Sequence, residues 1–122
     1  MEDRYLFKAK HFKKWHIGNI VKEPDGLYIR DIKGNVMEYI NDESTICQCT
    51  GLNDKKGDLI WENDIVKINN SKVNVLITFR DFEIICTIPN EKYYKHRLEY
   101  DTEYEVIGNI FDNPELLGRN DE

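Results

Sequence analysis

The chain has 122 residues, 40% of them hydrophobic and 33% charged, which suits a single compact unit with room for two lobes and excludes wholesale disorder. Its net charge of -6 is uneven, because residues 1–22 hold six Lys or Arg side chains against two acidic ones, a net +4 that leaves -10 in the remainder; phosphate binding would have to be local, since the acidic remainder repels a polyanion. No segment approaches the roughly 18 apolar residues of a membrane span, and the N-terminus lacks the apolar stretch of a signal peptide, so we expect a cytoplasmic protein.

The N-terminal segment is ambiguous in secondary structure. Residues 5–9, YLFKA, could open as a strand, and residues 11–23 place Phe12, Trp15 and Ile17 among basic side chains at a spacing that fits a strand and a helix equally. This segment could be a nucleic-acid arm, an oligomerisation strand or a solvated face. We favour a solvated face or a subunit contact.

From Pro24 onward the turn signals recur about every eight to ten residues, a spacing typical of short strands. Residues 26–33, GLYIRDIK, alternate in polarity. Residues 36–40, VMEYI, can pair with them across the turn formed by residues 33–35, Lys-Gly-Asn. The pattern predicts a β-hairpin.

The next predicted strand, residues 44–50, contains Cys47 and Cys49, and a third cysteine is Cys86. These spacings give no disulfide framework, which agrees with a reducing compartment. Zinc binding with a histidine (His11, His16 or His96) is an alternative, but structural zinc sites favour two Cys-x2–4-Cys-like units. We expect three small buried hydrophobes, no metal and no cofactor.

Residues 50–68, TGLNDKKGDLIWENDIVKI, predict two chain reversals followed by a strand. In the first reversal, Asp54 caps the turn and Gly57 takes the left-handed conformation. In the second, Asn63 tolerates a positive φ. This succession resembles the way SH3-like barrels begin.

This corner, residues 50–68, holds four carboxylates that could be metal ligands or an acid–base pair: Asp54, Asp58, Glu62 and Asp64. Their spacing does not fit a calcium-binding loop, and Asp at turns more often caps the backbone. We therefore interpret the corner as structural. Trp61, like Trp15, is expected in a core or an interface, because indoles supply large buried area.

Three further strands are predicted, over residues 71–79, 82–88 and 103–110, with Tyr104, Val106, Gly108 and Ile110 facing one way. The chain then ends in a helical turn, with Asn113 at the N-cap, Pro114 at the first helical position and Gly118 at the C-cap. Its two leucines are expected to plug one end of a barrel.

Between these strands, residues 89–102 form a predicted polar connection that interleaves aromatic and basic side chains. Its candidate binding residues are Tyr93, Tyr94, Lys95 and Arg97. Such side chains stack bases and neutralise phosphates on single-stranded nucleic acid. Acidic residues surround them, however, so a structural or partner-contact role is favoured.

The corner and the chain's ending carry a family resemblance. The corner fits the pattern T-G-L-x-D-x-x-G-x-x-I-aromatic-E-G-D-I-V, and residues 104–116 fit Y-E-V-I-G-N-I-aromatic-x-N-P-E-L almost throughout, which resembles the YopX-like family of phage and prophage proteins. Asn63 stands where the family has Gly, which supports the positive φ expected there. The fold-motif residues are Thr50, Gly51, Asp54, Gly57, Trp61, Asn63, Asp64, Gly108 and Pro114.

The resemblance implies a mainly β fold with an SH3-like barrel toward the C-terminus, an origin in a phage or prophage and hence a bacterial host, and no known catalytic residues. We predict an N-terminal β-hairpin subdomain with its basic segment (residues 1–49), followed by a small SH3-like β-barrel with a short C-terminal helical turn (residues 50–122). The two parts are expected to pack as one compact unit.

The sequence lacks a phosphate-binding loop, a nucleophile elbow and a dinucleotide fingerprint, so we do not expect an enzyme. We predict an accessory protein that acts as a protein-interaction module, self-associates as a homo-oligomer and binds a host or phage protein, with no membrane contact. The alternative is a nucleic-acid-binding module that uses the basic and aromatic loop or the N-terminal arm. A small metal-dependent hydrolase is a third possibility.

Overall fold

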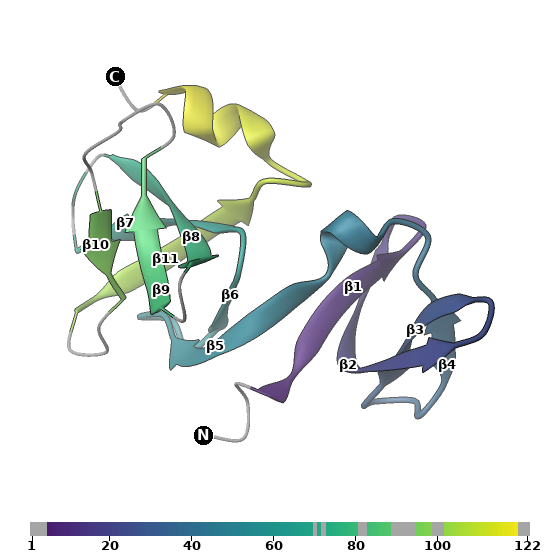
Figure 1. Ribbon diagram of the computed structural model, residues 1–122. Coiled ribbons are helices and arrows are strands. Elements are labelled where there is room, and N and C mark those ends of the chain that lie inside the picture. The colour runs from purple at the N-terminus through teal and green to yellow at the C-terminus, as the bar shows by residue number, and fades with distance from the viewer. Residues whose placement is uncertain are drawn as a thin grey trace. The chain divides into compact units, whose positions relative to one another are not determined.

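The protein is mainly β, as the computed structural model shows (Figure 1). The structure describes residues 5–69, 71, 73–80, 83–88, 95–98 and 102–119. The strands are β1 (Phe7–His11), β2 (Lys14–Glu23), β3 (Gly26–Asp31), β4 (Met37–Tyr39), β5 (Cys47–Asn53), β6 (Leu59–Trp61), β7 (Asp64–Ile68), β8 (Asn74–Arg80), β9 (Glu83–Thr87), β10 (Lys95–Arg97) and β11 (Tyr104–Asn109). Two short 3₁₀ helices are η2 (Glu43–Thr45) and η3 (Pro114–Arg119).

The strands form two antiparallel sheets, which confirms the predicted fold class at this level. One sheet has the order β4-β3-β2-β1-β5-β6 and the other the order β10-β9-β8-β7-β11. In the described ranges, neither helix has the length and apolar character that a membrane span requires.

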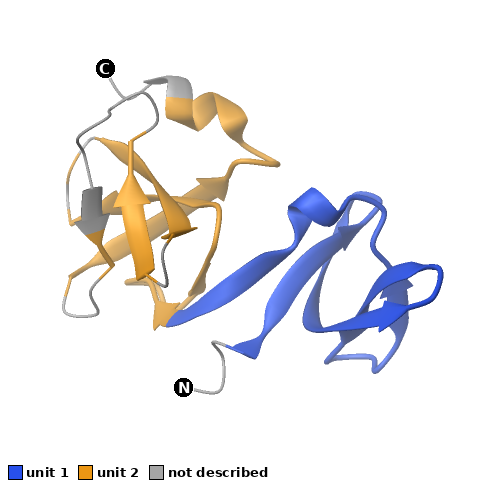
Figure 2. Cartoon of the chain, viewed as in Figure 1, with its two compact units in different colours: residues 1–51 blue, residues 52–122 orange. Residues whose placement is uncertain are grey.

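The chain divides into two compact units, unit 1 (residues 1–51) and unit 2 (residues 52–122), coloured in Figure 2. The sequence predicts the division after residue 49. Strand β5 carries the chain from unit 1 into unit 2. Each unit has a hydrophobic cluster of its own.

The ambiguous N-terminal segment forms a hairpin of β1 and β2, in which only Phe12 and Lys13 separate the paired strands. Its side chains alternate between the two faces of the sheet. Ala9 of β1 is fully buried and packs with Ile29 and Ile40 in the core of unit 1. Tertiary burial of one face therefore decides between the two periodicities that the sequence leaves open.

Strands β3 and β4 pair as the sequence predicts, with Tyr28 opposite Tyr39 and Arg30 opposite Met37. In the turn between them Asn35 has a φ of 54°. Asn tolerates this left-handed region better than most side chains, so the local sequence suits the turn.

Two side-chain hydrogen bonds join the tip of the β1–β2 hairpin to the last residue of β4 and to the segment after it. Nδ1 of His11 lies 2.9 Å from the carbonyl oxygen of Tyr39, and the backbone N–H of Phe12 donates to Oδ1 of Asn41 at 2.8 Å. Strands β1 and β4 are not neighbours in the sheet, so these bonds link parts of unit 1 that strand pairing does not join.

The strand predicted over residues 44–50 begins later than expected. Asp42 accepts hydrogen bonds from the backbone N–H and the hydroxyl of Ser44, at 3.0 and 2.7 Å, and caps η2. This local capping displaces the strand start to Cys47. Cys47 and Cys49 are almost fully buried, as predicted, and neither forms a disulfide within the described part of the chain.

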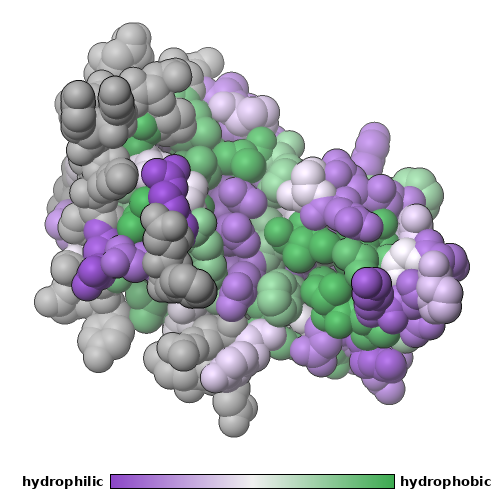
Figure 3. Space-filling model, viewed as in Figure 1, coloured by the Kyte–Doolittle hydropathy of each residue, from purple (hydrophilic) through white to green (hydrophobic). Residues whose placement is uncertain are grey.

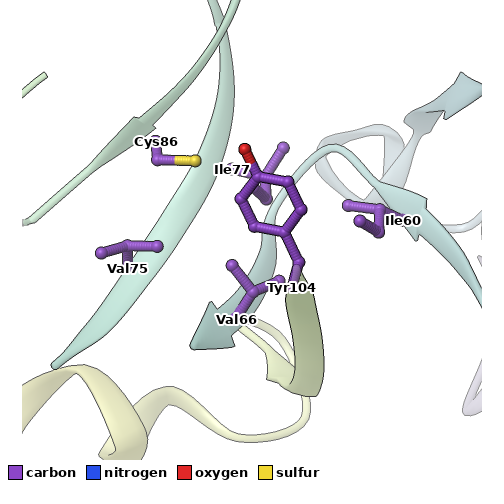
Figure 4. Packing of buried hydrophobic residues seen from close by; sticks show 6 residues of the cluster. All are labelled: Ile60, Val66, Val75, Ile77, Cys86 and Tyr104. Carbon is purple, nitrogen blue, oxygen red and sulfur yellow. The ribbon is translucent and has the colours of Figure 1, made fainter. Parts of the chain in front are cut away.

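An aromatic ring lies at the centre of the unit 2 core. Tyr104 of β11 is 2% exposed, and Figure 4 shows its ring among the side chains of β6 to β9. The alternation predicted for residues 71–79 places side chains of β8 in this core. The buried cluster comprises Ile60, Val66, Val75, Ile77, Cys86 and Tyr104.

The predicted connection over residues 89–102 was wrong in part, because Lys95–Arg97 form β10. This strand pairs with β9, with His96 opposite Cys86. A three-residue polar edge strand has little local signal, since its pairing depends on the neighbouring strand.

The last strand does not keep the single facing predicted for Tyr104, Val106 and Gly108. The register with β7 shifts between Val106 and Gly108, so Ile107 has no opposing residue. A bulge of this kind interrupts the alternation of a strand and bends it.

The predicted SH3-like barrel is not confirmed. Among the described strands, the sheet of unit 2 is open in order, with β10 and β11 as its edges. The predicted helical turn is present as η3, but it extends through Gly118. The side chain of Asn113 accepts from the backbone N–H of Asn109, at 3.3 Å, and so holds the end of β11.

We expect Gly18→Ala to destabilise unit 1. A Cβ at this position would overlap the carbonyl oxygen of Arg30 in β3, which is backbone and cannot move aside. We expect a loss of about 2 to 3 kcal/mol in the free energy of unfolding, measured by urea denaturation followed by circular dichroism. Gly34→Ala is the matched control, because its Cβ would meet only Val36 at an ordinary 3.5 Å; equal stability of the two variants would contradict the prediction.

Candidate functional site

The carboxylate of Asp54 is used by the fold. One oxygen accepts from the backbone N–H groups of Lys56 and Asp58, both at 2.9 Å, and the other accepts from Val106 at 3.0 Å. Burial raises the pKa of Asp54, but the three N–H donors outweigh it and hold that pKa below its usual range. Gly57 has a φ of 91°, the left-handed conformation expected in this turn.

The second reversal has the backbone that the sequence predicts. Asn63 has a φ of 74°, its N–H donates to Ile77 at 2.8 Å, and its carbonyl accepts from Ile110 at 3.1 Å. Asp64 is 2% exposed and accepts from the backbone N–H of Trp61 at 2.8 Å. Two of the four carboxylates that could have formed a site, Asp54 and Asp64, therefore cap turns.

The remaining fold-motif residues also have structural roles. Thr50 is buried at the end of unit 1, and Gly51 has a φ of 85°. Gly108 lies against the side chain of Asn113, where a Cβ would come within 2.6 Å of Oδ1. Pro114 begins η3.

The structure does not assemble the predicted binding cluster of the 89–102 segment within the residues that it describes. Tyr93 and Tyr94 lie outside them, and Lys95 is described only as backbone in β10. Arg97 is exposed, and its guanidinium forms an ion pair with Glu83 at 3.0 Å.

The described residues contain no group of three or more His, Cys, Asp or Glu side chains that could hold a metal ion. The thiol of Cys86 is also poorly suited to nucleophilic chemistry. Burial raises the pKa of Cys86 to about 12, so its thiol stays protonated near neutral pH.

A cavity of about 420 Å³ lies in unit 1. One wall holds His16, which is 7% exposed and whose Nδ1 lies 2.7 Å from Oδ2 of Asp31. The hydrogen bond to His16, and next the one from the backbone N–H of Lys33, lower the pKa of Asp31. The lining residues are Lys14, Trp15, His16, Ile17, Asp31, Ile32, Lys33, Gly34, Val36 and Glu38.

Sequence reasoning missed this site. The sequence indicates His16 as one of three alternative zinc ligands, and Asp31 as part of the alternating segment 26–33. The pair is brought together by the register of β2 and β3, in which Gly18 lies opposite Asp31. No sequence motif reports such a pairing.

The comparison with family models decides the family. The model described as YopX protein matches residues 19–118. The chain belongs to the YopX family. This confirms the resemblance carried by the corner and the chain's ending.

A solved structure of the YopX family agrees with the fold. The X-ray crystal structure of protein YopX from Bacillus subtilis has a TM-score of 0.62 and is 18% identical, and the match covers 93% of this chain and 98% of that one. At this identity the likeness shows a shared fold alone. None of the curated proteins matches the chain.

We expect Asp54→Asn to destabilise unit 2 in a pH-dependent way. The folded-state pKa lies below the unfolded value, so the carboxylate's stabilisation is fully present above about pH 4 and is lost as the pH falls through the folded pKa. Urea unfolding at pH 7 should show a loss of about 2 kcal/mol against wild type. Toward pH 3 this difference should shrink.

The matched control is Asp58→Asn, because the exposed Asp58 belongs to the same turn but contributes only backbone groups to its hydrogen bonds. A difference between wild type and Asp54→Asn that stays constant from pH 7 to pH 3 would contradict the role assigned to the charge.

Proposed function

We propose that this chain is a non-enzymatic accessory protein of a phage or prophage, a protein-interaction module that self-associates and binds a host or phage protein. We place it in the bacterial cytoplasm, where its three free cysteines would stay reduced. We also propose that unit 2 is related to SH3-like modules through its succession of short antiparallel strands, and that unit 1 acts as a separate hairpin subdomain.

Exposed apolar side chains on unit 1 support an interaction surface. Figure 3 shows hydrophobic side chains gathered on the visible face of unit 1, with hydrophilic ones around them. Exposed large apolar side chains in a group mark contact sites more often than single ones do. Among the described residues, the large apolar side chains that are exposed are Tyr5, Phe12, Ile32, Val36 and Tyr39, all in unit 1.

The proposal rests chiefly on the backbone conformation and the exposure of Phe12. This residue occupies the first position of the two-residue turn between β1 and β2, with a φ of 58°. A turn with positive φ at that position favours glycine, and a bulky side chain there costs about 1 to 3 kcal/mol. The ring is nevertheless 70% exposed, and its centroid lies 4.7 Å from that of His11 in an edge-to-face arrangement. Such a residue weakens the monomer's fold and offers apolar surface to a partner.

We expect Phe12→Gly to separate stability from association. Removing the strained side chain should raise the free energy of unfolding by about 1 kcal/mol. It should also shift the protein from oligomer toward monomer in size-exclusion chromatography with light scattering, because the apolar contact is lost.

Asn35→Gly is the control, because Asn35 also has a positive φ, 54°, but belongs to another turn of unit 1. It should leave the oligomer intact. A wild-type protein that stays monomeric across the concentration range would refute the self-association.

Binding to single-stranded nucleic acid is the second candidate. The ammonium groups of Lys8 and Lys10 lie 4.5 and 5.1 Å from the ring centroid of Trp15, which concentrates positive charge on the β1–β2 hairpin beside the exposed Phe12. Lys13 adds a third ammonium group at its tip. Basic side chains beside aromatic ones are the usual components of such sites.

This candidate predicts salt-dependent retention on single-stranded DNA. Lys13→Glu should weaken retention if the β1–β2 hairpin binds the DNA. Charge reversal of Lys95 and Arg97 should weaken retention if the basic and aromatic segment 89–102 binds it. Electrophoretic mobility at low salt measures both. The absence of any shift at low salt would end the nucleic-acid hypothesis, including its loop version.

A further inference from the structure

We propose that the unit 1 cavity is a binding site for a carboxylate attached to an apolar body, either a small organic acid or the C-terminus of a peptide. Its volume of about 420 Å³ falls in the range of about 300 to 1,000 Å³ typical of ligand pockets. The site shares Ile32 and Val36 with the exposed apolar group of unit 1, but Phe12, on which the self-association is argued, is not among the residues that line it.

The walls of the cavity are largely apolar. Trp15 and Ile17 of β2 contribute to one side, and Ile32 and Val36 from the β3–β4 turn contribute to the other. Ile32 and Val36 are 54% and 51% exposed, so branched apolar side chains stand in solvent beside the opening. A ligand with an apolar body would cover them and gain the free energy of burying apolar surface.

The polar part of the cavity is a buried imidazole with one nitrogen to spare. Nδ1 of His16 is bonded to Asp31, and among the described residues its Nε2 has no hydrogen-bond partner, although the side chain is more than nine-tenths buried. Asp31 is also bonded to the backbone N–H of Lys33, at 2.8 Å, so its oxygens are both occupied. Buried polar groups are normally paired, and an unpaired one in a cavity is a place for a ligand atom.

The charged side chains around the cavity favour an anionic ligand. Both lining carboxylates face an imidazole of the chain: Asp31 is bonded to His16, and Glu38 lies 3.6 Å from Nε2 of His11. Lys14 and Lys33 also line the cavity, and the described part of the chain gives their ammonium groups no ion-pair partner. The charged groups of the lining that have no partner among the described residues are therefore the two ammonium groups.

These groups define what each part of the ligand would meet. The carboxylate is attracted by the ammonium groups of Lys14 and Lys33, and in the imidazolium form Nε2–H of His16 can donate to it, since Asp31 takes the other N–H. The apolar body lies against the side chains from the β3–β4 turn. A neutral ligand of the same shape would gain only the apolar contact.

The probe is 3-phenylpropionate, titrated into ¹⁵N-labelled protein with the indole N–H of Trp15 and the backbone signals of β2 as reporters. Its neutral analogue, 3-phenylpropionamide, should bind roughly tenfold more weakly. Replacing Lys14 and Lys33 together by Met should weaken the binding of 3-phenylpropionate by a similar factor. Lys22→Met, also in β2 but outside the cavity, is the matched control and should bind as wild type does.

Val36→Trp tests the cavity itself. Val36 is half-exposed, so a larger side chain at this position does not disturb the buried core and the variant should stay folded. Binding should be lost, because the indole fills the cavity. A tripeptide ending in Phe, compared with its C-terminal amide, distinguishes a peptide C-terminus from a small acid as the natural source. Equal affinity of the acid and its amide, or no shift of the Trp15 indole signal at millimolar probe, would overturn the proposal. Because Phe12→Gly leaves this cavity unchanged, loss of self-association and loss of ligand binding can be told apart.

Discussion

The fold of unit 2 depends on the carboxylate of Asp54. Three backbone N–H groups converge on it, two from its own turn and one from Val106 in β11, so a single side chain ties residues that are far apart in sequence. The neighbouring backbone reinforces the link, because the N–H of Lys55 donates to Tyr104 at 2.8 Å. Tyr104 in turn fills the core. The turn, the last strand and the core ring are thus positioned by one buried charge that is fully hydrogen bonded.

This arrangement explains which parts of unit 2 could be predicted from sequence. The conformations of Gly57 and Asn63 are local requirements of the backbone, and few residue types satisfy them, so the residue type reports the conformation. The bulge at Ile107 and the edge strand β10 depend on the register of a neighbouring strand instead. Local sequence carries little information about such features. Closure of the expected barrel would depend on the register of several strands at once, so the sequence indicates it even less.

Unit 1 shows the same limit at the level of a site. The alternation in residues 26–31 predicts β3, but nothing in it indicates that the carboxylate of Asp31 meets the imidazole of His16, 15 residues away. That contact follows from how β2 and β3 approach at Gly18, where a side chain would overlap the facing backbone. A glycine in the middle of a strand is therefore the sequence signal that could have pointed to a close approach there.

The two units differ in how far local and tertiary preferences agree. In unit 2 the strained backbone positions at 57 and 63 are occupied by Gly and Asn, the residue types best suited to them, and the buried carboxylates of Asp54 and Asp64 cap turns. In unit 1 a strained turn position holds an exposed Phe12, and a buried imidazole lines a cavity with one nitrogen unbonded to any described residue. Sequences are usually consistent across these levels, and departures that weaken the fold without local compensation concentrate at functional sites. The recognition proposed above therefore belongs to unit 1, whereas the corner at residues 50–68, which carries part of the family resemblance, holds unit 2 together.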